Sequence, residues 1–167
     1  MKSTRPIWSA IGLTTIFLMV SSSLGLAREG VLPGKIGDYG KYFNRQSVES
    51  FSGKVLEVYQ QRYSSKSSLY ATAIQVERDD GEGEAIVYLG PKSRLDKEGF
   101  AIEPGEDVCI LGSEARIDEQ NIVIAQQLNR GNYVLALRNA TGRHFSLEST
   151  VLEGDDEDTC LVAYLGD

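Results

Sequence analysis

The chain has few of the side chains from which metal centres are usually built. Its 167 residues include two cysteines and one histidine. Because metal sites usually bring several His, Cys or carboxylate ligands together, a lone histidine such as His144 is more typical of a surface or capping position than of a ligand. We therefore predict no metal and no cofactor.

Catalytic motifs are missing as well. The sequence has no Cys-x-x-Cys pair, no haem attachment motif and no Gly-x-Ser-x-Gly elbow, and its glycines do not match a phosphate loop. The acidic segment 79–84 does not have the spaced oxygen ligands of a calcium loop, which favours a solvated hairpin turn. We expect a protein that is not an enzyme.

The chain also has fewer basic than acidic residues. Lys and Arg number 17 against 24 Asp and Glu, a net charge of −7. Residues 1–27 hold two of the basic residues and none of the acidic ones, so the rest of the chain has 15 basic against 24 acidic residues, a net charge of −9. A field of this sign disfavours nucleic acid as a partner.

Long apolar runs are confined to the N-terminus. Lys2 and Arg5 precede the apolar segment 7–20, and small residues surround Ala27, which together predict a signal peptide over 1–27, cleaved after Ala27, and a periplasmic location. The alternative is an uncleaved anchor, since 7–27 just reaches the roughly 20 residues of a spanning helix, although serines interrupt the run. No cysteine follows where a lipoprotein signal would need one.

The sequence is rich in short alternating apolar segments bounded by turn residues. Strands are expected at 51–59, 69–77, 84–89, 107–116, 122–128 and 133–138. A looped or helical connection, 90–97, follows the third strand, an order typical of the OB-fold. The predicted fold class is all-β, a small OB-fold-like barrel of five to six strands.

The barrel is expected to span 51–147. It is preceded by an N-terminal arm, 28–50, and followed by an acidic and apolar C-terminal tail, 148–167. The arm is punctuated by glycine and is expected to be a linker or loosely docked terminus, with one helical turn, rather than a binding arm.

Strand phase predicts which side chains face the barrel interior, because neighbouring side chains point to opposite faces. The expected inward set is Thr72, Ile74, Val76, Val108 and Ile110, and this phase turns Cys109 outward. A bulge is expected near residues 56–57. The third strand is apolar on both faces, so its orientation stays open.

Short motifs spaced along the predicted barrel carry a resemblance to a known family. They are 87–91 (VYLGP), 102–108 (IEPGEDV), 111–113 (LGS), 124–125 (IA) and 135–139 (LALRN). Over residues 52–145 the chain resembles a group of exported bacterial OB-fold proteins that includes the C-terminal domain of the magnetosome proteins MamS and MamX. The resemblance implies an accessory or binding domain of the cell envelope.

The candidate binding residues surround the loop between the first two strands, which borders the usual ligand face of an OB-fold. They are Arg62, Tyr63, Lys66, Tyr70 and Tyr88. Aromatic and cationic groups there suit stacking on, and pairing with, a partner or an anionic or sugar-like ligand. Asp118 and Glu119 in the opposite loop would repel phosphate, and a solvated surface loop is the alternative.

Three function classes follow. A non-catalytic periplasmic binding or scaffold module that contacts another envelope protein comes first, because it needs only an exposed barrel face. A small-ligand or oligosaccharide binder is second and would need an aromatic-lined concavity. Nucleic-acid binding is third. No membrane span is expected after signal cleavage.

The two cysteines are predicted to form a disulfide. Cys109 is expected to project outward, and the apolar stretch that follows Cys160 would be exposed unless it docks on the barrel. An exported chain meets an oxidising compartment, in which such pairs are normally bridged. Two free thiols, or one poised for exchange, are the alternative.

Overall fold

The computed structural model describes residues 31–131, 133–143 and 152–153. Two short 3₁₀ helices come first, η1 (Ile36–Tyr42) and η2 (Arg45–Ser47). The strands are β1 (Val48–Arg62), β2 (Tyr70–Arg78), β3 (Glu84–Pro91), β4 (Asp107–Ile117), β5 (Gln120–Arg130), β6 (Tyr133–Ala136) and β7 (Leu152–Glu153). Helix α1 (Lys92–Lys97) lies between β3 and β4.

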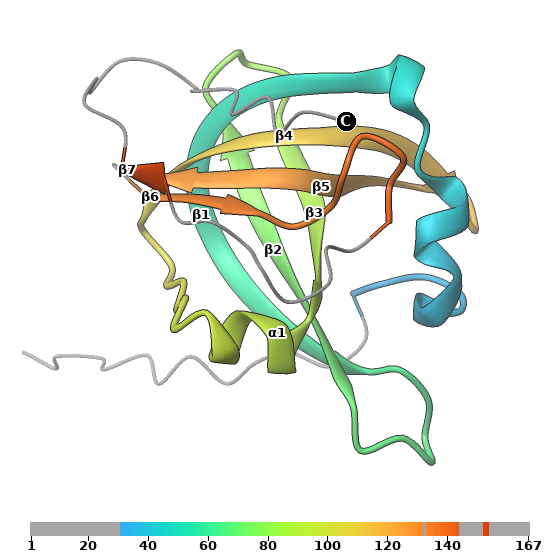
Figure 1. Ribbon diagram of the computed structural model, residues 1–167. Coiled ribbons are helices and arrows are strands. Elements are labelled where there is room, and N and C mark those ends of the chain that lie inside the picture. Colours follow the sequence, from blue (N-terminus) through green and yellow to red (C-terminus); the bar gives the residue numbers. More distant parts are fainter. Residues whose placement is uncertain (1–30, 132, 144–151, 154–167) are drawn as a thin grey trace, which may run out of the picture.

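The strands form one sheet that closes on itself. Their order is β3-β2-β1-β4-β5-β6-β7, and a short parallel pairing of 86–88 with 122–124 joins β3 to β5. Strands β1 to β5 thereby enclose a barrel with α1 at one end (Figure 1). The all-β, OB-fold-like class predicted from the sequence is confirmed, as is a helical connection after the third strand.

The first strand bends in order to take part in both halves of the barrel. It pairs with β4 through 48–54 and with β2 through 53–62. A register shift lies between Val55 and Glu57, where a bulge was predicted. Gly53 belongs to both pairings, and a Cβ there would collide with the carbonyl oxygen of Glu77. Glycine is therefore required where the strand turns from one partner to the other.

The barrel has two apolar faces rather than one. The interior cluster contains Ile74, Val76, Val108 and Ile110, as the strand phase predicted, and Cys109 between the last two is half-buried. A second cluster lies on the outer face and includes Tyr59, Ala71, Ala73, Tyr88, Ile122 and Ile124. Both faces of β3 are apolar because both are covered.

The N-terminal arm covers the outer face. Leu32, Ile36 and Tyr39 are buried in the second cluster. The side-chain amide of Gln61 accepts a hydrogen bond from the backbone N–H of Leu32 at 2.9 Å and donates one to its carbonyl at 3.0 Å. The expectation of a loosely docked terminus is wrong for residues 31–43, since the apolar side chains of this segment complete the packing of the sheet.

Among the helices of the described segments, none has both the length and the apolar composition needed to cross a bilayer. The predicted signal peptide lies outside the described residues, as do His144 and Cys160.

Candidate functional site

The loop between β1 and β2 extends beyond the barrel. Figure 1 shows the two strands continuing into a hairpin, drawn in green, whose end projects away from the other strands. This hairpin carries Arg62, Tyr63, Lys66 and Tyr70 of the predicted binding set. The fifth member, Tyr88, lies in β3.

Internal hydrogen bonds shape the hairpin end. The backbone N–H of Tyr63 donates to the carbonyl of Leu69 at 3.1 Å, and the N–H of Ser67 donates to the carbonyl of Ser64 at 3.0 Å. The hydroxyl of Ser67 accepts from the N–H of Leu69 at 3.0 Å. The loop is thus pre-organised, which lowers the entropic cost of binding through it.

Arg62 and Tyr70 brace each other across the base of the loop. The Arg62 Nε donates to the Tyr70 hydroxyl at 2.7 Å, and the guanidinium carbon lies 5.4 Å from the centre of the Tyr70 ring. The guanidinium is therefore held by two contacts to one side chain. Arg62 itself is exposed.

The hairpin end combines positive charge with an exposed apolar side chain. Lys66 is exposed, and Leu69 is 58% exposed. No Asp or Glu occurs between Glu57 and Glu77, so this segment is locally cationic in an acidic chain. The sequence patterns treated Leu69 only as the first residue of a strand. We name the set Arg62, Lys66, Leu69 and Tyr70 the hairpin tip.

Two of the five predicted residues, Tyr63 in the hairpin and Tyr88 in the barrel, link the two parts. Tyr88 is 2% exposed, and its hydroxyl lies 3.2 Å from that of half-buried Tyr63. Burial and this hydrogen bond raise the pKa of Tyr63. The ring of Tyr39 from the arm meets Tyr88 edge-on, with centroids 4.8 Å apart. Tyr63 and Tyr88 thus anchor the hairpin to the arm and barrel.

A buried arginine adjoins these tyrosines. Arg138 is 1% exposed, and its guanidinium carbon lies 4.9 Å from the centre of the Tyr88 ring. The Nη1 donates to the carbonyl of Ala125, whereas Nε and Nη2 have no hydrogen-bond partner among the described residues. Burial lowers the pKa of Arg138 to about 10. Sequence reasoning noticed this residue only as part of a motif, because no pattern marked it as interior.

The remaining candidates lie elsewhere. Asp118 and Glu119 form the two-residue turn between β4 and β5, both with positive φ, and a Cβ on Gly34 of the arm would lie 2.8 Å from Asp118 Oδ2. This acidic turn therefore borders the arm. Within residues 31–143, leaving out 132, no three His, Cys, Asp or Glu side chains are placed to hold a metal ion.

Comparison with known proteins assigns the family. The model of the MamS/MamX magnetosome protein family matches residues 47–135. This range covers more than half of the chain and includes β1 to β5, so the chain belongs to that family, as the sequence motifs indicated. A search of curated proteins finds no match.

Proposed function

We propose that this member of the MamS/MamX family is a non-catalytic binding module of the cell envelope that holds a partner protein through its hairpin tip. The observation that carries the proposal is the exposed Leu69 beside Arg62, Lys66 and Tyr70 on a loop braced by its own hydrogen bonds. Tyr and Arg around an apolar centre are the side chains that interfaces favour.

The packing of the arm supports this choice of surface. In an OB-fold the outer face of the second and third strands commonly receives the ligand. Here Leu32, Ile36 and Tyr39 occupy that face, so it is closed to a ligand while the arm stays docked. The hairpin projects past the area that the arm covers.

Charge defines the kind of partner. The hairpin tip holds two exposed cations and no acid, which suits an acidic surface patch with an apolar spot at its centre. Nucleic acid is disfavoured because the whole chain carries a net charge of −7. The predicted signal peptide supports a periplasmic location, where such a partner would be another envelope protein.

A binding comparison between two triple variants tests the proposal. In residues 28–167, R62A/K66A/L69A removes three of the four side chains of the hairpin tip and leaves Tyr63 and the barrel packing unaltered. The control, K97A/R116A/Y133A, removes two exposed cations and one exposed apolar side chain elsewhere on the surface. Photo-crosslinking from position 65 in envelope extracts first identifies the partner by mass, and its affinity is then measured with purified proteins.

The tip variant should lose at least about tenfold in affinity, because hot-spot residues each contribute more than 1 kcal/mol. The control should bind like the unaltered chain, and both variants should unfold within about 0.5 kcal/mol of it. Equal loss in both variants, or unchanged affinity in the tip variant, would contradict the assignment of the tip.

A further inference from the structure

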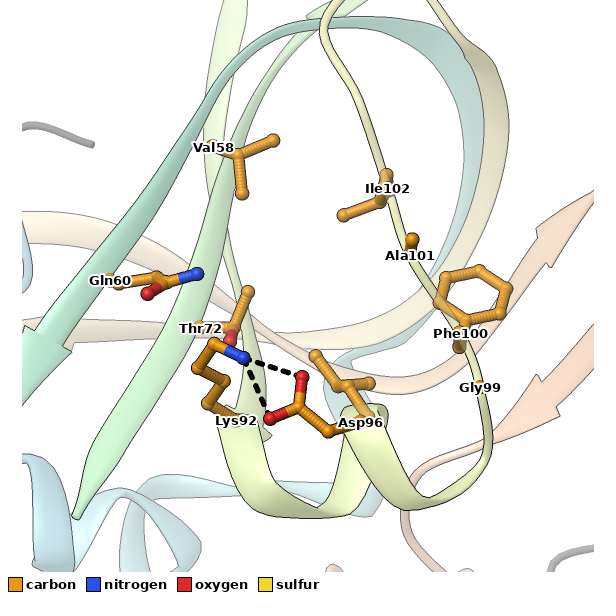
Figure 2. A pocket seen from close by; sticks show the side chains of 10 residues that line it. Val58, Gln60, Thr72, Lys92, Asp96, Gly99, Phe100, Ala101 and Ile102 are labelled. Carbon is orange, nitrogen blue, oxygen red and sulfur yellow. Dashed lines mark hydrogen bonds and ion pairs between the residues drawn. The ribbon is translucent and has the colours of Figure 1, made fainter. Parts of the chain in front are cut away.

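Two sides of the barrel are covered by segments described above. The arm packs on the part of the outer face that includes Tyr88 and Ile124. At the barrel end, Figure 2 shows α1 and the segment 99–102 facing β1 and β2 across a cavity of about 380 Å³. Leu95 of α1 and the nearby Phe100 pack on the interior cluster. The outer face of β4, β6 and the second half of β5 remains.

The strand phase shows which side chains belong to this remaining face. Ile110, Leu128 and Leu135 belong to the interior cluster and lie opposite one another across β4, β5 and β6. Their neighbours along each strand therefore point outward. We name these outward residues the third face: Cys109, Leu111, Gln127, Asn129, Val134 and Ala136.

The third face is buried although it lies outside the barrel. Gln127 is 3% exposed, Asn129 7% and Val134 4%. Val134 and Ala136 belong neither to the interior cluster nor to the cluster that the arm completes. The outward side chains of an antiparallel sheet stay in contact with water unless another segment lies over them. The cover of the third face therefore comes from a segment other than the arm.

The composition of the third face suits a peptide as its cover. Val134, Ala136 and half-buried Leu111 offer apolar contacts. Gln127 Nε2 donates to Asn129 Oδ1 at 2.8 Å, so two carboxamide groups lie together in the buried part of the face. A carboxamide has both a donor and an acceptor and so matches the N–H and C=O groups of a peptide backbone. The third face thus fits an extended segment with apolar side chains.

Strand register fixes the distance from the end of the described chain to Cys109. One row of paired residues crosses four strands: Leu152 in β7, Val134 in β6, Asn129 in β5 and Cys109 in β4. With about 4.8 Å between neighbouring strands, this row is roughly 14 Å long. It crosses the third face from edge to edge.

The chain that follows β7 is long enough to return along this row. The eight residues 153–160 span up to about 27 Å when extended, at about 3.4 Å per residue. Cys160 is therefore within reach of Cys109. Residues 161–165, with the sequence LVAYL, follow directly and are apolar.

We propose that residues 161–165 dock on the third face of their own chain as a strap. Their apolar side chains pack on Leu111, Val134 and Ala136, and their backbone pairs with the carboxamides of Gln127 and Asn129. The predicted disulfide between the two cysteines fixes the point at which the strap begins. The strap does not involve the hairpin tip, so it stands independently of the proposed partner protein.

Photo-crosslinking tests where the strap lies. In residues 28–167, benzoylphenylalanine replaces Ser50, an exposed residue of β1 that pairs with Leu111, or Arg116, an exposed residue near the far end of β4. We expect position 50 to crosslink to residues 161–165 of the same chain, identified by mass spectrometry, and position 116 not to do so. The C109S/C160S variant should keep the crosslink, because β7 holds the segment close to the face.

Three outcomes of this experiment would overturn the proposal. The first is the absence of any crosslink from position 50 to residues 161–165. The second is a crosslink found only between two chains, which would mean that a second copy supplies the cover. The third is a crosslink that requires both cysteines, which would mean that the bridge alone, and not the third face, positions the segment.

Hydrogen exchange tests whether the same segment buries the third face. L161S/V162S/Y164S/L165S removes the apolar side chains of the strap, and D155S/D156S/D158S is the control in the same tail. The side-chain amide hydrogens of Gln127 and Asn129, followed by NMR, should exchange with water at least about tenfold faster in the strap variant, because their cover is lost. The control should exchange like the unaltered chain.

Unchanged exchange in the strap variant, or equal acceleration in the control, would contradict the proposal. Thermal unfolding shows whether the strap variant keeps a folded barrel, which is expected because the interior cluster is unaltered. If the variant does not fold, the crosslinks from positions 50 and 116 still decide, since they are measured with the strap sequence unaltered.

Discussion

Replacing Arg138 by methionine should stabilise the protein. Arg138 is one of the largest fully buried side chains, and two of its guanidinium nitrogens have no partner among the described residues. A buried charge without a counter-charge is unfavourable, and well-packed apolar residues of similar volume often improve stability at such sites. Methionine has a flexible side chain that fills irregular space.

The expected gain follows from three opposing contributions. Lowering the pKa of Arg138 to about 10 corresponds to a cost of about 3 to 4 kcal/mol for the charged form, at about 1.4 kcal/mol per pKa unit. Against this, the variant loses the hydrogen bond to the Ala125 carbonyl, worth about 1 kcal/mol. It also loses the contact with the Tyr88 ring, worth about 1 kcal/mol. The net gain is about 1 to 2 kcal/mol, or roughly 3 to 6 °C in Tm.

Denaturant unfolding near pH 7 measures the difference, and Arg94→Met is the matched control. Arg94 is half-buried and donates to the carbonyls of Ala136 and Leu137 at 3.2 and 3.0 Å. Its loss leaves these acceptors without their donor, so R94M should be destabilised by about 2 kcal/mol.

The pH dependence has a definite sign. Because the folded-state pKa of Arg138 is lowered, its charge destabilises the fold at pH values below about 10, and the penalty is relieved as pH rises through that value. The advantage of R138M should therefore be complete near neutral pH and shrink above pH 10. A loss of 2 kcal/mol or more in R138M at pH 7 would refute the reasoning, since it would mean that the guanidinium has a strong partner.

Three further predictions concern the arm, the cysteines and the N-terminus. Ile36→Ala should destabilise the fold by about 3 kcal/mol, because it leaves a cavity under the arm, whereas exposed Tyr42→Ala should change little; equal effects would show that the arm does not contribute to the core. Cys109 and Cys160 should form a disulfide that closes a loop of about 50 residues and adds on the order of 4 kcal/mol; two reactive thiols in the unreduced, denatured protein would rule it out. The exported protein should begin at Arg28, and an intact N-terminus by mass spectrometry would contradict cleavage.

Local sequence patterns predicted the strands and much of their orientation. Ile74 and Val76, and likewise Val108 and Ile110, face the interior as their spacing predicted, and the bulge lies between Val55 and Glu57. These features were readable because side-chain alternation along a strand has a period of two and depends only on neighbouring residues. The turn residues at the ends of each segment can also be recognised from the local sequence.

The packing of the outer face and the arrangement of the candidate site depend on contacts between distant segments of the chain. The arm docks on a surface that exists only after β1, β2, β3 and β5 come together. The sequence of the arm therefore did not predict that its apolar residues are buried. The same closure buries Tyr88 and Arg138 and encloses Thr72 beside α1. Leu69 stays exposed for the opposite reason, since its hairpin projects beyond the sheet. Burial at these positions depends on contacts between residues that are distant in the chain, which local periodicity does not encode.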